Sequence, residues 1–224
     1  GGLPNNAVNM VTIAPEIMEK LAPYIELAEK LGSFLAQMAR GISRLRVIYS
    51  GALVDLQTGA ITTSIIKGLL ERIVDDHVNL VNADYLAKRR GIKVETVHRG
   101  NGDDYHNRIS IEAETAEGLV TVAGSVFQPD SPRIVEINGY RVDAVPTGYM
   151  LVAPHQDRPG IIGKVGTLLG QAGINIATMQ VGRKKQGDPA VMVLGTDAAL
   201  SPDLLNTICK IDGIQGAKQV VLAR

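Results

Sequence analysis

A cluster of polar groups between residues 155 and 175 has the chemistry to bind a small zwitterion. Asp157 supplies an acceptor for an ammonium group, and a charge-assisted hydrogen bond of this kind contributes about 1.5–3 kcal/mol. The main-chain amides of Gly160 and Ile161 lie where a helix is expected to begin, so they are free to donate to a carboxylate, which the helix dipole also favours. Asn175 offers both a donor and an acceptor. His155 could hydrogen-bond the same carboxylate, so these five residues predict an effector-binding site.

Each of these side chains also has a simpler interpretation. Asp157 could only cap the helix amides, Asn175 could only satisfy a turn, and His155 at a strand end could be a solvated side chain. Arg158, in the same turn, is more typical of a surface charge than of a ligand contact. The binding hypothesis therefore depends on the convergence of these groups at one helix N-terminus.

The elements that position this cluster follow from apolar spacing and turn residues. Residues 149–153 are a short apolar run typical of a strand. We expect the helix to begin with Pro159 at its first position, where a missing N–H has no cost, and to end at Gly173 as a C-cap glycine. The expected buried stripe of this helix is Ile161, Ile162, Val165, Leu168 and Leu169.

The remaining segments of the last third continue the pattern of strands and helices. Residues 190–196 and 217–222 are expected strands, and residues 201–210 an expected helix that Ser201 caps. A glycine-containing hairpin, residues 183–188, joins the two middle strands. Together with Asp-Arg-Pro-Gly at 157–160 and Gly-Ile-Asn-Ile at 173–176, this order resembles an ACT domain, a regulatory ferredoxin-like βαββαβ module of amino-acid metabolism.

The first two thirds of the chain predict a mixed α/β domain preceded by a helical arm, so the fold class is α+β. Residues 1–13 look like a linker, residues 15–21 like a short helix, and Pro23 is expected to restart a helix that runs through Arg40. A second long helix is expected over residues 58–74, interrupted near Gly68. A short helix near residues 86–90 follows, and the expected strands are 45–49, 93–97, 107–114, 119–127, 133–137 and 141–144, the last two joined by an Asn138-Gly139 hairpin.

Several segments of this domain are similar to those of one known neighbour of ACT domains. They are Ile-Tyr-Ser-Gly at 48–51, Lys-Gly-Leu-Leu at 67–70, Val-Asn-Leu-Val-Asn-Ala at 78–83, Val-Ala-Gly-Ser-Val-Phe at 122–127 and Ile-Asn-Gly-Tyr at 137–140. They resemble the intervening, allosteric-substrate-binding domain of long-form D-3-phosphoglycerate dehydrogenases. The expected division is a linker and helical arm at 1–40, the intervening domain at 41–146 and the ACT domain at 147–224.

This resemblance implies a regulatory fragment with its catalytic half absent, an expectation that the start at Gly-Gly-Leu rather than Met supports. It implies L-serine as a feedback effector between two protomers, with Asn175 reaching across from the facing chain. No cofactor is expected in this fragment, because NAD would belong to the missing catalytic half. A homo-oligomer through the ACT and intervening domains is expected, since an ACT sheet with an unpaired edge favours self-association.

The sequence carries no recognisable catalytic motif. No G-x-G-x-x-G follows a strand, and Gly160, Gly163 and Gly166 fall within one expected helix, where a slim packing face is the simpler interpretation. No histidine, cysteine and carboxylate cluster has metal-ligand spacing, and no serine sits in a nucleophile elbow. We therefore expect no catalysis from this polypeptide alone.

A second, weaker candidate is an anion site in the upstream domain. Lys67, Lys88, Arg133 and Arg141 could meet near Asn82 and bind a phosphorylated substrate or another anion. The sequence Lys88-Arg89-Arg90 is also explained by a solvated helix C-terminus, where cations complement the dipole.

Composition limits the remaining possibilities. The formal net charge is zero, so nothing indicates nucleic acid or an anionic membrane, and no apolar run reaches the length of about 18 residues that a span needs. A single cysteine, Cys209, cannot form an internal disulfide and fits a reducing cytoplasm.

Three other functions share part of this sequence pattern. A free-standing amino-acid sensor shares the ACT pattern. The small subunit of an iron–sulfur L-serine dehydratase has a similar two-domain plan, but its serine-rich N-terminal stretch and cluster cysteines are missing. An RNA-recognition sheet shares the βαββαβ order but stacks bases on strand aromatics, and residues 176–181 and 190–194 contain none.

Overall fold

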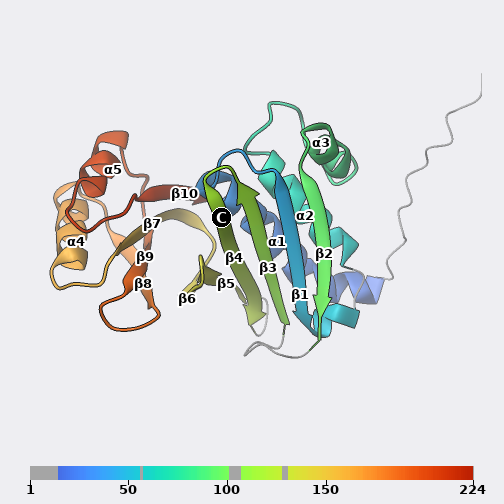
Figure 1. Ribbon diagram of the computed structural model, residues 1–224, viewed down its shortest axis with the longest axis horizontal. Helices are drawn as coiled ribbons and strands as arrows, with labels where there is room; N and C mark the ends of the chain where they lie inside the picture. The colour runs from blue at the N-terminus through green and yellow to red at the C-terminus, as the bar shows by residue number, and fades with distance from the viewer. Residues whose placement is uncertain (1–14, 56–57, 101–106, 128–130, 224) are drawn as a thin grey trace, which may run out of the picture.

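The computed structural model describes residues 15–55, 58–100, 107–127 and 131–223. The linker expected for residues 1–13 lies outside them. Two sheets, each covered by helices on one face, form the molecule (Figure 1). The expected α+β class is confirmed.

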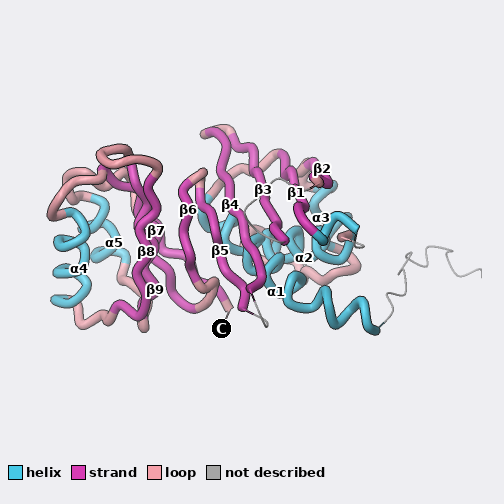
Figure 2. The backbone as a smooth tube through the Cα atoms, turned by 90° about the horizontal axis from the view of Figure 1, so that it is seen from below, coloured by secondary structure: helices cyan, strands magenta, loops and turns pink. Residues whose placement is uncertain are grey.

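The first sheet has six strands in the order β2-β1-β3-β4-β5-β6. Strands β1 and β2 are parallel and the other neighbours are antiparallel. Helices α1, α2 and α3 cover one face and leave the other open (Figure 2). The elements of this domain are α1 (Pro15–Met38), β1 (Arg44–Gly51), the short 3-10 helix η1 (Ala52–Asp55), α2 (Gly59–Leu70), α3 (Ala83–Arg89), β2 (Lys93–Arg99), β3 (Asn107–Thr115), β4 (Gly118–Phe127), β5 (Ser131–Ile137) and β6 (Tyr140–Ala144).

The expectation that Pro23 divides the first helix is wrong, because α1 runs without interruption from Pro15 to Met38. Proline removes one hydrogen bond of the helix ladder. Leu21 and Leu27, on either side of Pro23, are fully buried in the same hydrophobic core. Burial of this kind contributes about 1.5–3 kcal/mol for each large side chain, so packing on both sides outweighs the lost bond.

The expectation that Gly68 interrupts the second helix is also wrong. Helix α2 continues through Gly68 and ends at Leu70. A Cβ atom at Gly68 would lie 2.0 Å from the main-chain oxygen of Glu29, and one at Gly32 would lie 2.0 Å from that of Ile65. The two glycines therefore let the backbones of α1 and α2 touch, and Gly68 is a packing residue.

Turn residues behave as their local chemistry predicts. Asn138 and Gly139 both have positive φ, 49° and 78°, and connect β5 to β6 as expected. This is the backbone conformation of a type I′ hairpin turn.

The second sheet has the order β10-β7-β9-β8, with all neighbours antiparallel. Helices α4 and α5 cover its outer face (Figure 2). Its elements are β7 (Gly148–Gln156), α4 (Ile161–Gln171), β8 (Ile176–Arg183), β9 (Pro189–Thr196), α5 (Pro202–Cys209) and β10 (Lys218–Leu222). This order is that of a ferredoxin-like fold, as expected for an ACT domain.

The ends of α4 and α5 test the expected capping residues. Ser201 accepts from the amide of Leu204 at 3.2 Å, so the expected cap of α5 is confirmed. Gly173 follows α4 with φ 70°, and Ile174 donates to the oxygen of Leu169, the bonding pattern of a Schellman motif. Pro159 is not the first helical residue, because α4 begins at Ile161 after Gly160, whose φ of 91° suits only glycine well.

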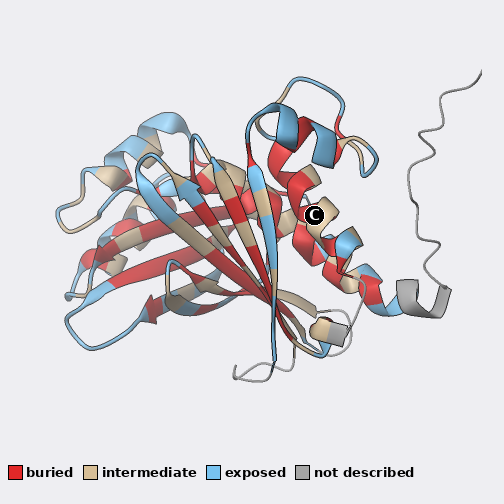
Figure 3. Cartoon of the chain, turned by 45° about the vertical axis from the view of Figure 1, so that its right-hand side comes forward, coloured by how far each residue is buried: buried red, intermediate tan, exposed pale blue. Residues whose placement is uncertain are grey.

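The inner face of the second sheet packs on the first domain. Met150, Val152 and Val193 belong to the same hydrophobic core as α1 and the six-stranded sheet. Figure 3 shows the buried residues gathered between the helices and sheets. Because one core crosses the boundary, the two domains hold a fixed contact in this structure.

The edge strand β10 is also tied to α1 by hydrogen bonds. The side-chain amide of Gln37 donates to the oxygen of Val221 at 3.0 Å and accepts from its N–H at 2.8 Å. Arg72 donates to the same oxygen at 2.7 Å. Gln37 thus pairs with the edge of the sheet as a neighbouring strand would.

Candidate functional site

The loop between β7 and α4 brings four of the five predicted effector residues to one end of the ACT sheet. His155 lies in β7, Asp157 follows the strand, and Gly160 and Ile161 form the start of α4. No described side chain caps the first amides of α4, so those donors remain available to a ligand. The strand–turn–helix order thus assembles the expected N-terminal part of the site.

Asp157 does not cap the helix but pairs with the end of β8. Its carboxylate accepts from Nη1 of Arg183 at 2.9 Å and from the amide of Gly187 at 3.4 Å. These two hydrogen bonds, the one from Arg183 first, hold the pKa of Asp157 below its usual value. Asp157 is therefore an anionic acceptor whose present partner is an arginine.

His155 is buried, with 1% of its surface exposed, so the solvated role considered for it does not apply. Its Nδ1 lies 3.1 Å from the carbonyl oxygen of Ala153. Because a carbonyl only accepts, Nδ1 carries the proton in this contact, and Nε2 is the nitrogen left for another partner.

Asn175 lies at the opposite end of the sheet. It precedes β8, whose first residue pairs with Thr196, whereas Arg183 at the end of β8 pairs with Ala190. Seven residues of extended strand span roughly 23 Å. Within one chain Asn175 therefore does not meet Asp157, and its side chain donates to Asp197 at 2.7 Å.

Arg158 is held away from the expected site. Its guanidinium pairs with the carboxylate of Asp212 and donates to the main-chain oxygen of that residue at 2.9 Å. This contact ties the β7–α4 loop to the turn before β10, as expected for a structural surface charge.

The five residues of the expected anion site are not brought together. Lys67 lies between α1 and α2 and pairs with Glu29 at 2.6 Å and Glu71 at 2.9 Å. Burial acts to lower the pKa of Lys67, but the hydrogen bonds and charges of the two glutamates more than offset it, so the pKa is raised. Lys67 thus forms structural ion pairs between α1 and α2.

The other four members lie on separate elements. Asn82 precedes α3 and is engaged in a local turn, with its oxygen accepting from the amide of Asn79 at 2.8 Å. Lys88 is exposed in the last turn of α3, the solvated position considered above. Arg133 in β5 pairs with Asp143 at 3.2 Å, and Arg141 is exposed in β6.

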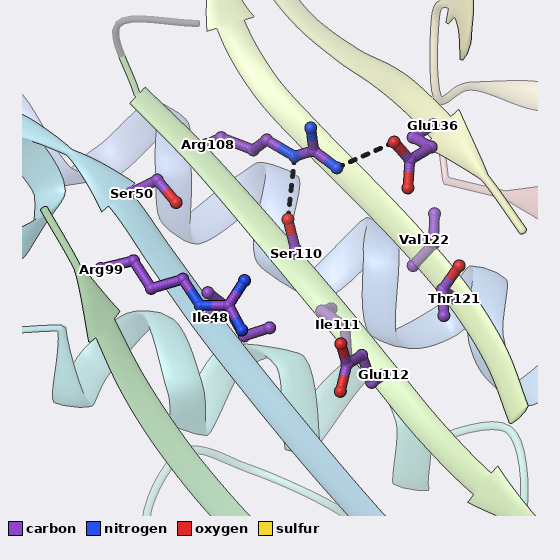
Figure 4. Close-up of a pocket in the computed structure, with 10 residues that line it drawn as sticks. All are labelled: Ile48, Ser50, Arg99, Arg108, Ser110, Ile111, Glu112, Thr121, Val122 and Glu136. Atoms are coloured by element: carbon purple, nitrogen blue, oxygen red, sulfur yellow. Dashed lines mark hydrogen bonds and ion pairs between the residues drawn. The ribbon is translucent and has the colours of Figure 1, made fainter. Parts of the chain in front are cut away.

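A pocket of about 150 Å³ lies instead on the open face of the six-stranded sheet. Arg99, Ser50 and Arg108 are direct cross-strand neighbours on β2, β1 and β3. Arg108 donates to Ser110 at 2.9 Å and pairs with Glu136 at 3.0 Å. Arg99 lies over β1, and within the described ranges no carboxylate is within ion-pair distance of it (Figure 4).

Sequence reasoning missed this pocket because it depends on strand register. Residues 50, 99 and 108 are far apart in the chain, and only the pairing of three strands places them in one row. The available signal was the alternation in β1, where Arg44, Arg46, Ile48 and Ser50 fall on one face of the sheet.

Element order and sheet topology together define an α+β domain followed by a ferredoxin-like βαββαβ domain. Residues 150–213 match the model of the ACT domain, and residues 20–138 match that of the D-3-phosphoglycerate dehydrogenase intervening domain. The second match covers more than half of the chain, which therefore belongs to the D-3-phosphoglycerate dehydrogenase intervening-domain family. It corresponds to the C-terminal part of such enzymes.

Three relatives named D-3-phosphoglycerate dehydrogenase illustrate the similarity. The protein from Synechocystis sp. is 40% identical over 99% of this chain, that from Methanocaldococcus jannaschii 40% over 96%, and that from Bacillus subtilis 36% over 99%. The chain spans only 40%, 41% and 42% of their respective lengths.

Within the described part of the chain, no helix is both long and apolar enough to cross a membrane.

Proposed function

We propose that this chain is the regulatory part of a D-3-phosphoglycerate dehydrogenase and binds L-serine as a feedback effector at paired ACT domains. The observation that carries the proposal is the position of the two halves of the site. Asp157 and the start of α4 lie at one end of β8, Asn175 lies at the other, and β8 is an edge strand.

Antiparallel pairing of β8 with a second copy would unite these halves. If the pair is centred on Met179, Asn175 of one copy lies opposite Arg183 of the other, next to Asp157. Met179 and Val181 on β8 are 41% and 38% exposed, and the outer edge of β8 has no strand partner within the described ranges. An unpaired edge strand with exposed apolar side chains favours such an association.

The chemistry at this junction matches an amino acid. Asp157 accepts from the ammonium group, the amides at the start of α4 donate to the α-carboxylate, and Asn175 of the second copy contributes a donor and an acceptor. A serine that touches both copies favours the paired arrangement, because a ligand stabilises the state that it binds more tightly.

Membership of this family also suggests the pathway in which this regulation would act. The NAD-dependent oxidation of D-3-phosphoglycerate in cytoplasmic L-serine biosynthesis would belong to the remainder of a longer enzyme, and oligomers would form through both domains. The match to the intervening-domain model favours this assignment over a free-standing sensor or the small subunit of a serine dehydratase.

Calorimetry with L-serine and D-serine tests the effector proposal. Wild type is expected to bind the L enantiomer selectively, and Asp157→Ala and Asn175→Ala are each expected to weaken binding at least about tenfold without unfolding the protein. Asn206→Ala, an exposed asparagine on α5, is the matched control. Equal heats of binding for the two enantiomers, or no heat of binding for either, would contradict the proposal.

Mixing the two variants with weakened binding tests the shared site directly. A dimer of one Asp157→Ala and one Asn175→Ala chain contains one site with both changes and one intact site, so mixing is expected to restore part of the binding. A site built within one chain would gain nothing from mixing.

We also propose a second ligand class, a small oxyanion, for the pocket on the six-stranded sheet. Arg99 and Arg108 flank Ser50, and guanidinium groups bind phosphate or carboxylate in bidentate geometry. Inorganic phosphate is expected to perturb the NMR signals of Ser50 and Ser110 in wild type and not in Arg99→Gln, with Arg89→Gln, a change of an exposed arginine on α3, as control. Identical phosphate responses in all three proteins would contradict this assignment.

A further inference from the structure

The last two residues of β8 and Lys184, which follows the strand, contact two different parts of the molecule in alternation. Gly182 is buried against β6, where a Cβ atom would lie 2.4 Å from the main-chain oxygen of Arg141. Arg183 points instead to Asp157 of the candidate effector site. The ammonium group of Lys184 lies 5.3 Å from the ring centroid of Tyr140, on the same β6 hairpin.

For Gly182 and Arg183 this alternation follows from the period of two of a β-strand. Residues on either side of Arg183 are engaged with the first domain, while Arg183 itself is engaged with the loop that opens α4. A change in the position of Arg183 must therefore be accommodated by neighbours that have little freedom, since Gly182 has no space for even one additional carbon atom.

Arg183 also holds the group that an ammonium ligand needs. The carboxylate of Asp157 is 22% exposed and already accepts from Arg183 and from the amide of Gly187. Both bonds end on Oδ2, so a ligand ammonium can approach Oδ1, but there it meets the positive guanidinium that already neutralises the carboxylate. Arg183 is thus an internal competitor for the negative charge of Asp157, and a bound ammonium group is expected to weaken its contact with the carboxylate.

We propose that Arg183 is a latch that competes with the effector for Asp157 and passes occupancy of the site to the β6 hairpin of the intervening domain. The inference rests on the proposed function for the identity of the ligand. The contacts themselves belong to the unliganded chain. Arg183 is a positioning residue for this site, and it acts on binding through Asp157.

Comparison of Arg183→Gln with Lys185→Gln tests the latch. Both variants remove one positive charge from the same exposed hairpin, but in the described part of the chain Asp157 is bonded to Arg183 and not to Lys185. Since the loss of one exposed ion pair has a modest effect, Arg183→Gln is expected to bind L-serine about two- to fivefold more tightly than wild type. Binding of L-glycerate, which lacks the ammonium group, is expected to stay the same in both variants.

The effect of ligand binding on the β6 hairpin is measured at Tyr140. Its ring NMR signals, assigned with Tyr140→Phe, are expected to shift on addition of L-serine to wild type and to Lys185→Gln, and to shift much less in Arg183→Gln. If L-serine binds and Arg183→Gln weakens its binding or leaves it unchanged, the latch is wrong. The latch is also wrong if L-serine binds and the Tyr140 signals do not shift.

Failure of the effector proposal is distinguished by a ligand-free measurement. If wild type does not bind L-serine, the assignment of the ligand falls and the latch is judged by NMR titration alone. Arg183→Gln is then expected to raise the pKa of Asp157 and to displace the Tyr140 signals, and Lys185→Gln to do neither. Identical spectra and titrations for the two variants would overturn the latch.

Discussion

Replacing Gly68 with alanine is expected to destabilise the protein by about 3 kcal/mol, the upper end of the range for overpacking a well-packed core. The added Cβ would lie 2.0 Å from the main-chain oxygen of Glu29, where an ordinary contact needs at least 3.4 Å. A main-chain atom within a helix cannot move aside as the end of a flexible side chain can. Helices α1 and α2 must therefore separate along their contact.

Urea unfolding of the Gly68→Ala variant measures this effect, as a lower midpoint at an unchanged slope. The control is Gly59→Ala at the start of the same helix, where, apart from the neighbouring helix backbone, no described atom lies within 4 Å of the added carbon. That change is expected to be neutral or to stabilise by up to about 1 kcal/mol, because alanine restricts the unfolded chain. Equal midpoints for the two variants would show that α1 and α2 do not touch through their backbones.

Replacing Gln37 with alanine is expected to cost about 2 kcal/mol and to loosen the contact between the domains. The change removes the bonds of 3.0 Å and 2.8 Å to Val221 and leaves a partly buried N–H without its acceptor. Arg72 still binds the Val221 oxygen and the apolar core is still shared, so the contact is weakened, and the ACT domain is expected to unfold at a lower temperature than the first domain.

Differential scanning calorimetry tests this expectation, with one transition in wild type and a broadened or divided one in Gln37→Ala. Gln171→Ala, an exposed glutamine on α4, removes the same side chain from a position outside the interface. A Gln37→Ala trace that matches the Gln171→Ala trace would show that the Gln37 amide does not hold the domains together.

A structural feature could be predicted from the sequence when the residues that determine it are close together along the chain. Asn138-Gly139, the Ser201 cap and the end of α4 at Gly173 were predictable, because a turn or cap is decided by the conformational preferences of a few consecutive residues. Pro23 and Gly68 were misjudged, because their local preferences are overridden by the packing of α1 on α2.

The candidate sites divide in the same way. The approach of Asp157 to the start of α4 follows from adjacent residues, so the chain itself predicts it. The pairing of Asp157 with Arg183, the distance to Asn175 and the row of Arg99, Ser50 and Arg108 depend on strand register. Register is fixed by contacts between strands that are distant in sequence, and no local pattern contains it.

The sequence by itself thus determined the two-domain α+β class and the strand–turn–helix that opens the ACT domain, since apolar periodicity and turn residues encode both. Only the tertiary structure decided which charges meet, which faces stay open and how the second sheet rests on the first domain. Those outcomes arise from packing and pairing across the whole chain, where one buried face can be satisfied only by another.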